Sequence, residues 1–368
     1  MLNYRICTSL FAFPASCILV LAAAGAQSPV PAAPSAPTTP LATAAAIPPA
    51  DPHRIDIDVE VTDKLGHHVS GLQAQDFTVL DNKQPASILN FREVDSRDPA
   101  KGPVHVVIVI DTINTGIQEV AREREQLGEF LKQDGGRLGH ATSLAVLTEK
   151  GMQIEKGFST DGNALLATLN GFTAPMRFEG RSAGFYGAAD RLQWSLAELS
   201  QLAALEAQVP GRKLAFFISP GWPLFSRAGI EETNKQRDWT FNSIVALNNG
   251  LREAHLTLYT IDPFELGRTN PFYYQSFLKP VAKTNDAQYA NLGLQVLSTH
   301  SGGLVEVTGA DIKGEIETAI RDADAYYALT VESAPADRSN EYHDLHVQVD
   351  KPGTVIRTTS GYYANVQH

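Results

Sequence analysis

A continuous apolar run from Val104 to Ile110 constrains the fold of this chain more than any other feature. A strand with one solvated face alternates apolar and polar residues. An unbroken run therefore predicts a parallel strand that is buried on both faces and covered by helices. The run ends in Asp111, and a carboxylate at the tip of a central strand lies where open α/β sheets bind ligands. An alternative stays open, in which Asp111 only caps the helix that follows.

The N-terminal residues are expected to serve export rather than the fold. Arg5 precedes an apolar stretch over residues 6–23, and Ala24-Gly25-Ala26 has the small residues of a cleavage site. We therefore predict a signal peptide over residues 1–26, which leaves Gln27 as the mature N-terminus of a periplasmic or secreted protein. An uncleaved membrane anchor is the alternative, because the stretch is nearly long enough to span a bilayer. Residues 27–52 are rich in Pro and Ala, which predicts an extended linker.

Composition excludes several kinds of site and partner. Both cysteines, Cys7 and Cys17, lie in the predicted signal peptide, so the mature chain would have no disulfide and no thiolate metal site. The chain has 41 Asp and Glu against 30 Lys and Arg, a net charge of −11, which repels the phosphates of nucleic acid. No later stretch is apolar for long enough to span a membrane.

From Val104 onward, apolar strands alternate with amphipathic helices. Residues 144–147, 214–219 and 256–261 form further apolar strands, and Leu192, Leu196 and Leu199 lie on one face of a long helix. This alternation predicts a doubly wound, mainly parallel, Rossmann-like α/β sheet over residues 102–323.

Short strands with turns between them lie on both sides of this region. Ile55, Ile57, Val59 and Val61 alternate with acidic residues, which indicates a half-buried strand. Further strands are predicted over residues 69–72, 76–80, 88–94, 326–331, 343–349 and 355–358. We predict that residues 53–98 and 325–366 form the two halves of one seven-stranded β-sandwich, into which the α/β region is inserted.

Several stretches carry a resemblance to a known family: VTDKLGHHVSGLQAQDFTVLDNKQPASILNF, VIVIDTINTG, GRKLAFFISPG and the HSGG turn. Over residues 54–366 the chain resembles the von Willebrand factor type A domain. More narrowly, it is similar to the VWFA-related Acidobacterial domain family of exported bacterial proteins. The resemblance implies a non-enzymatic interaction or adhesion module. Such a module binds a protein or extracellular ligand through the loops at the C-terminal edge of its sheet.

The same resemblance implies a metal site that has lost some of its ligands. Type A domains hold Mg²⁺ with an Asp-x-Ser-x-Ser loop, a Thr and a later Asp, all hard oxygen ligands. Asp111 and Thr115 match the loop, whereas Ile113 replaces its first Ser and Ser219-Pro220 stands where the later Asp would lie. Ser182 is the best substitute for the Thr. The candidate ligand-binding residues are Asp111, Asn114, Thr115, Ser182 and Ser219, and Asp111 and Thr115 are the candidate ligands of Mg²⁺.

A serine hydrolase is the alternative function. Gly180-Arg181-Ser182-Ala183-Gly184 matches the nucleophile-elbow pattern, with Ser182 as nucleophile and His300 or His255 as the base. This pattern needs a buried strand before it, yet Pro175 and Arg177 precede it and favour a loop.

Overall fold

The central sheet of this computed structural model contains seven strands within the described residues, which are 54–96, 103–172, 184–223, 232–262, 272–306 and 311–366. The strands are β5 (Val104–Asp111), β6 (Arg137–Leu147), β7 (Gln153–Ile154), β8 (Ser159–Asp161), β9 (Arg212–Ile218), β10 (Leu256–Ile261) and β11 (Val305–Glu306). They follow the order β11-β10-β9-β5-β6-β7, with β8 also pairing with β6. All pairs are parallel except those that β7 and β8 make with β6.

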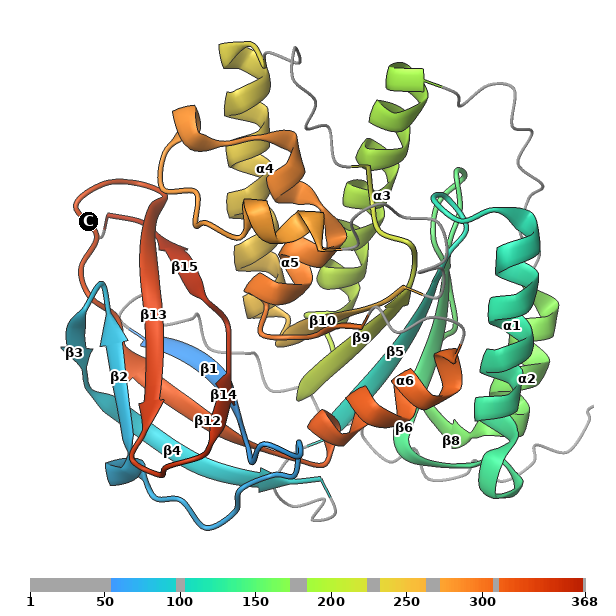
Figure 1. The fold of residues 1–368 in the computed structure, drawn as a ribbon, viewed down its shortest axis with the longest axis horizontal. Coiled ribbons are helices and arrows are strands. Elements are labelled where there is room, and N and C mark those ends of the chain that lie inside the picture. Colours follow the sequence, from blue (N-terminus) through green and yellow to red (C-terminus); the bar gives the residue numbers. More distant parts are fainter. Residues whose placement is uncertain are drawn as a thin grey trace, which may run out of the picture. The chain divides into compact units, whose positions relative to one another are not determined.

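Helices cover both faces of this sheet (Figure 1). One face packs against α1 (Ile117–Lys132), α2 (Gly162–Gly171) and α6 (Ile312–Ala319). The other packs against α3 (Gly184–Glu206), α4 (Asn234–Glu253) and α5 (Leu294–His300). Alternate residues of β5 enter the two cores, so the unbroken apolar run follows from burial on both faces. The predicted fold class is confirmed.

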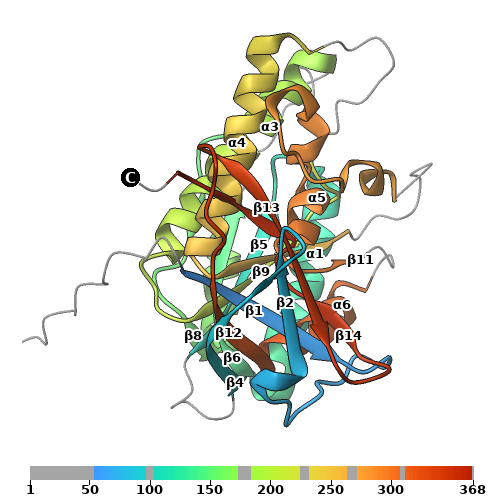
Figure 2. The same cartoon turned by 90° about the vertical axis from the view of Figure 1, so that its left-hand side faces the viewer.

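Two antiparallel four-stranded sheets flank the central sheet. The first has the order β14 (Val355–Arg357), β1 (Arg54–Thr62), β12 (Ala325–Glu332), β4 (Ile88–Asp95). The second has the order β15 (Gly361–Ala364), β13 (Glu341–Val349), β2 (Phe77–Asp81), β3 (Gln84–Ala86). Figure 2 shows β2 and β13 in front of β1 and β12, and a common apolar core includes residues from both sheets. Strands from the two ends of the chain thus pair with each other, as the sequence predicts.

The short elements differ from the predictions. Residues 69–72 form no strand, whereas β3 and β15 were not predicted, so the two sheets together have eight strands in the described residues. Two short helices meet at Gly293, which ends η7 (Tyr289–Leu292) and caps the start of α5. The other 3₁₀ helices described are η1 (Ala74–Asp76), η3 (Gln133–Gly135), η5 (Tyr273–Phe277), η6 (Thr284–Asp286) and η8 (Ile320–Ala323).

Residues 50–368 form one compact unit, and the division into segments 53–98 with 325–366 and 102–323 stays a prediction. The predicted signal peptide and linker lie outside the described residues. Among the described helices, none has both the length and the apolar character needed to cross a bilayer.

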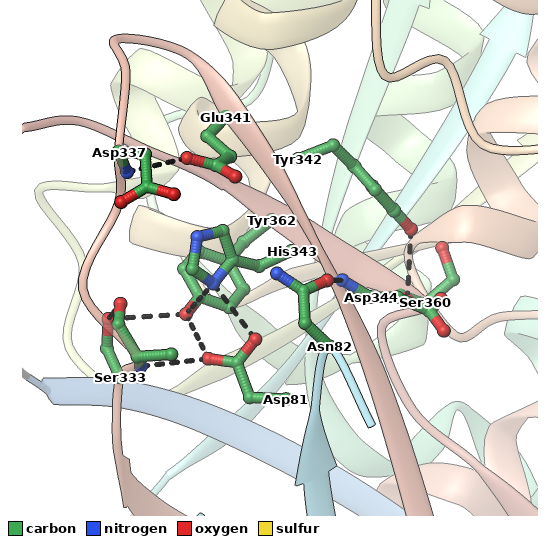
Figure 3. A network of polar contacts seen from close by, with 11 residues as sticks. Asp81, Asn82, Ser333, Asp337, Glu341, Tyr342, His343, Asp344, Ser360 and Tyr362 are labelled. Atoms are coloured by element: carbon green, nitrogen blue, oxygen red, sulfur yellow. Dashed lines mark hydrogen bonds and ion pairs between the residues drawn. The ribbon is translucent and has the colours of Figure 1, made fainter. Parts of the chain in front are cut away.

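A buried polar network lies inside the β-sandwich (Figure 3). His343 on β13 is 1% exposed, and its Nδ1 lies 2.9 Å from Oδ1 of Asp81 on β2. The other oxygen of Asp81 accepts hydrogen bonds from the Tyr362 hydroxyl at 2.6 Å and the Ala334 backbone N–H at 2.9 Å. The network therefore ties β2, β13 and β15 to the chain that follows β12.

A second buried network joins the sandwich to the central sheet. Arg212, at the start of β9, contacts Glu60 on β1 and donates to the Asp322 carbonyl at 3.0 Å. Asp322 in turn accepts from the Tyr259 hydroxyl and from Arg357, both at 2.7 Å. Arg212 and Glu60 are only 3% and 2% exposed. Charged groups buried to this extent need partners of opposite charge, and this network supplies them.

Candidate functional site

Asp111 at the tip of β5 organises the loop at the carboxyl edge of the central sheet. Its Oδ1 accepts backbone hydrogen bonds from Ile113 at 3.0 Å and Asn114 at 3.1 Å. Its Oδ2 accepts from the Asn114 side chain at 2.9 Å and the Ser219 hydroxyl at 2.7 Å. The side chain is completely buried, so these four donors compensate for the loss of water.

These bonds show that Asp111 does not cap the following helix. α1 begins at Ile117 with Gly116 as its N-cap, and no side chain caps it. Asp111 instead holds a turn within its own loop, the common role of an Asp that bonds backbone groups two and three residues on. The alternative in which it is only a helix cap is therefore wrong.

The loop is also connected to neighbouring elements. The Asn114 amide nitrogen donates to the Ser195 hydroxyl on α3 at 2.9 Å, and the Gly221 N–H donates to Ser219 at 3.1 Å. Asp111, Asn114 and Ser219 are thus brought together, as the sequence suggested. Thr115 is buried beside them, but its hydroxyl has no partner among the described residues. Ser182 lies outside the described residues.

Several carboxyl groups give this edge an acidic character. Burial raises the pKa of Asp111, although the hydrogen bonds from Asn114 and Ser219 oppose the shift. Burial also raises the pKa of Glu123 on α1 well above its usual range, and the charges of Asp111, Glu119 and Asp262 raise it further. Burial raises the pKa of Glu198 on α3 to about 7, with Asp111 adding to the increase. Additional negative charge is therefore unfavourable at this edge.

The described residues do not make a good site for Mg²⁺. Both oxygens of Asp111 already accept hydrogen bonds, and two of the donors are the side chains of Asn114 and Ser219. No group of three or more acidic, histidine or cysteine side chains in the described segments is arranged to hold a metal ion. Mg²⁺ requires near-octahedral oxygen ligands and gives up its water reluctantly. Asp111 and Thr115 alone do not meet this requirement.

The histidines considered as a catalytic base lie elsewhere. His255 immediately precedes β10, at the edge of the sheet opposite Asp111. His300 at the end of α5 has its Nδ1 2.6 Å from the Ser360 hydroxyl, and burial lowers its pKa to about 4.

Sequence reasoning missed three residues of this edge, namely Ser195, Glu123 and Glu198. Two of them, Ser195 and Glu123, were detectable in principle. Ser195 lies between Leu192 and Leu199 on the buried face of α3, and Glu123 lies between Val120 and Leu127 on the buried face of α1. A polar residue at a buried position of an amphipathic helix is a signal that it faces other polar groups.

We predict that Asp111→Ala lowers the free energy of unfolding by about 1–3 kcal/mol, because buried donors lose their acceptor. Asp111→Asn should be less harmful, since it keeps an oxygen for the two backbone N–H groups. Urea unfolding of the three proteins measures the difference. Millimolar Mg²⁺ or Mn²⁺ should leave the melting temperature of the wild type almost unchanged. A metal-dependent rise that disappears in Asp111→Ala would show a working cation site and contradict this prediction.

Comparisons with known proteins give similarity in structure only. No family model matches the chain, and no characterised protein matches it in sequence. Similar solved structures include a von Willebrand factor type A protein from Catenulispora acidiphila, with 10% identity over 86% of this chain and 75% of that one, at a TM-score of 0.31. The PilB minor pilin from Streptococcus sanguinis has 12% identity over 61% of this chain and 62% of its own, at 0.32. The manganese-loaded TRAP protein of Plasmodium vivax has 11% identity over 76% of this chain and 98% of its own, at a TM-score of 0.31. The chain thus spans less than two thirds of the PilB pilin, and similarity at this level carries no argument about function.

Proposed function

We propose that this protein is an exported, non-enzymatic interaction or adhesion module of the VWFA-related type, which binds a protein or extracellular ligand. The binding surface is the carboxyl edge of the central sheet, around the loop from Asp111 to Ile117. The observation that carries the proposal is the bonding of Asp111. All four of its hydrogen bonds fix this loop, so the loop is rigid before a partner arrives. A preorganised loop reduces the entropic cost of binding.

The surface next to this loop has the mixed character of a contact site. Ile117 is 53% exposed at the start of α1, immediately after the ordered loop. Glu119 follows it on the same helix, and the carboxyl groups of Glu123, Glu198 and Asp262 lie buried at the same edge. An exposed aliphatic side chain beside an acidic edge favours a partner with an apolar group flanked by basic residues.

A pair of charge-matched variants tests this proposal. Ile117→Lys should reduce retention of the partner on immobilised protein at least tenfold, because it adds a charge and removes an apolar contact at the proposed surface. Leu65→Lys is the control, since Leu65 is 78% exposed in a turn of the sandwich. The measurement is capture from the organism's own envelope extract, followed by titration of the captured protein. Equal losses in both variants, or no loss in Ile117→Lys, would contradict the proposal.

A further inference from the structure

One pocket lies away from the Asp111 loop, between the sandwich and the central sheet. It has a volume of about 850 Å³, part of which is open to solvent. Its lining includes Ile57 on β1, Leu251 on α4, Val281, and Tyr363 on β15. Leu256, the first residue of β10, also lines it, so the pocket lies at the amino edge of the sheet. The lining combines apolar with polar side chains, and small-ligand sites use apolar walls for affinity and placed polar groups for orientation.

Two polar side chains on α4 line this pocket with unused hydrogen-bonding groups. Asn248 donates from Nδ2 to the Gly361 carbonyl at 3.2 Å, but its buried Oδ1 has no partner among the described residues. Arg252 lies one helical turn later, and its Nε is also buried and without a hydrogen bond in the described segments. The only ion pair described for its guanidinium joins it to Glu253 at 3.7 Å. The pocket therefore offers one free acceptor and one free donor at adjacent positions of a helix face.

Other polar groups of the lining already have partners. The Tyr363 hydroxyl donates to the Val281 carbonyl at 2.8 Å, and the Tyr342 hydroxyl donates to the Ser360 carbonyl at 3.1 Å. His300 lies within 2.6 Å of the Ser360 hydroxyl and is neutral at neutral pH, because burial lowers its pKa to about 4. Asp56 and Asp58 also line the pocket, and their charges oppose the binding of an anion at Arg252.

We propose that this pocket binds a neutral amide-bearing ligand with a branched apolar group. An amide presents an N–H and a C=O together. Its carbonyl would accept from Arg252 Nε–H and its N–H would donate to Asn248 Oδ1, while the apolar group packs against Leu251 and Val281. This site is independent of the proposed partner surface at the Asp111 loop.

The amide can come from a peptide chain or from a free small molecule. β14 pairs with β1 only over Glu60–Thr62, so the β1 edge that lines the pocket has no strand beside it among the described residues. The Asp58 carbonyl on that edge accepts a hydrogen bond from the Thr358 hydroxyl at 2.7 Å. Addition of an extended peptide to an unpaired strand edge is a common mode of peptide binding, so a peptide source predicts tighter binding by longer ligands.

The test uses three probes and follows their titration by NMR shifts of the backbone amides of α4. N-isopentylacetamide and isopentyl acetate differ only in replacement of the N–H by an oxygen. The amide should bind about tenfold more tightly, because the ester leaves Asn248 Oδ1 unpaired. The third probe is the blocked tripeptide acetyl-Ala-Leu-Ala-amide. Tighter binding of the tripeptide than of the amide assigns a peptide source, and equal or weaker binding assigns a free amide. Both outcomes support the site.

Variants locate the binding within the pocket. Arg252→Met keeps the aliphatic stem and removes the donor, so the amide should bind about tenfold more weakly. Arg122→Met on the exposed face of α1 is the matched control and should bind as the wild type does. Val281→Phe fills the apolar end and should abolish binding, while its melting temperature shows that it is folded. Equal binding of ester and amide, no binding of either, or unchanged binding in Arg252→Met would overturn the proposal.

Discussion

Replacement of Arg212 by methionine should lower the free energy of unfolding by about 3–5 kcal/mol, the usual result of removing one partner from a buried ion pair. Arg212 is 3% exposed and contacts Glu60, the Asp322 carbonyl and, at 3.5 Å, Asp58. Its guanidinium also lies 4.5 Å from the centre of the Tyr326 ring. Methionine fills similar space, but it leaves buried carboxyl groups without their cation.

Urea unfolding, read by circular dichroism, measures this loss. Arg122→Met is the control, because Arg122 is exposed on α1 and methionine has a similar helix propensity. The control should change the free energy of unfolding by less than about 0.5 kcal/mol. A variant at Arg212 that is as stable as the control would show that the network contributes nothing to stability.

Replacement of Asp81 by alanine should have an effect of similar size, about 3–5 kcal/mol. Asp81 is 2% exposed. Its carboxylate forms hydrogen bonds with the His343 ring, the Tyr362 hydroxyl and the Ala334 backbone N–H. Each buried donor that loses its acceptor costs about 1–3 kcal/mol. Asp344→Ala is the matched control, since Asp344 follows His343 directly but is exposed. Thermal and urea unfolding of both variants measure the difference.

The contribution of Asp81 should also depend on pH. Burial alone would raise the pKa of Asp81, but the hydrogen bonds from His343, Tyr362 and Ala334 outweigh it and lower the pKa below its ordinary value. As the pH falls, the Asp81 carboxylate is therefore protonated in the unfolded chain before it is protonated in the folded protein. The stabilisation is complete above the ordinary Asp pKa of about 3.9 and is lost as pH falls through the lower pKa of the folded state. Asp81→Ala should therefore lose less stability than the wild type below about pH 4. An identical acid profile would contradict this assignment.

The sequence was informative where burial leaves a regular pattern. The run from Val104 to Ile110 has no polar face because helices cover both sides of β5, so its burial and parallel pairing were predictable. Asp111 was found for the same reason, since the end of that run marks the edge of the sheet. Its bond to Ser219 joins residues 108 positions apart, and pairing over that distance depends on the order of the strands. A single sequence does not give that order.

Glu60 shows where the pattern misleads. It alternates with Val59 and Val61, which predicted a solvated face for the first strand. In the structure that side of β1 meets the central sheet, and Glu60 is 2% exposed against Arg212. Periodicity distinguishes apolar from polar faces, but it does not show whether a polar face meets water or a charged partner. Short edge strands such as β3 were missed because three residues, one of them Pro85, carry no period.

The pairing of β1 with β12 has a consequence for the order of folding. Ile57 pairs with Leu329, more than 250 residues later, whereas β5, β6, β9 and β10 pair within the stretch from Val104 to Ile261. During synthesis, which starts at the N-terminus, all four of these strands of the central sheet emerge before β12 does. β1 and β4 must then wait with unpaired edges until residues 325–332 arrive, because both pair with β12 in the same sheet. A chain that stops short of β12 would keep those edges open, so pairing of β1 with the whole of β12 reports that the chain has emerged at least to Glu332.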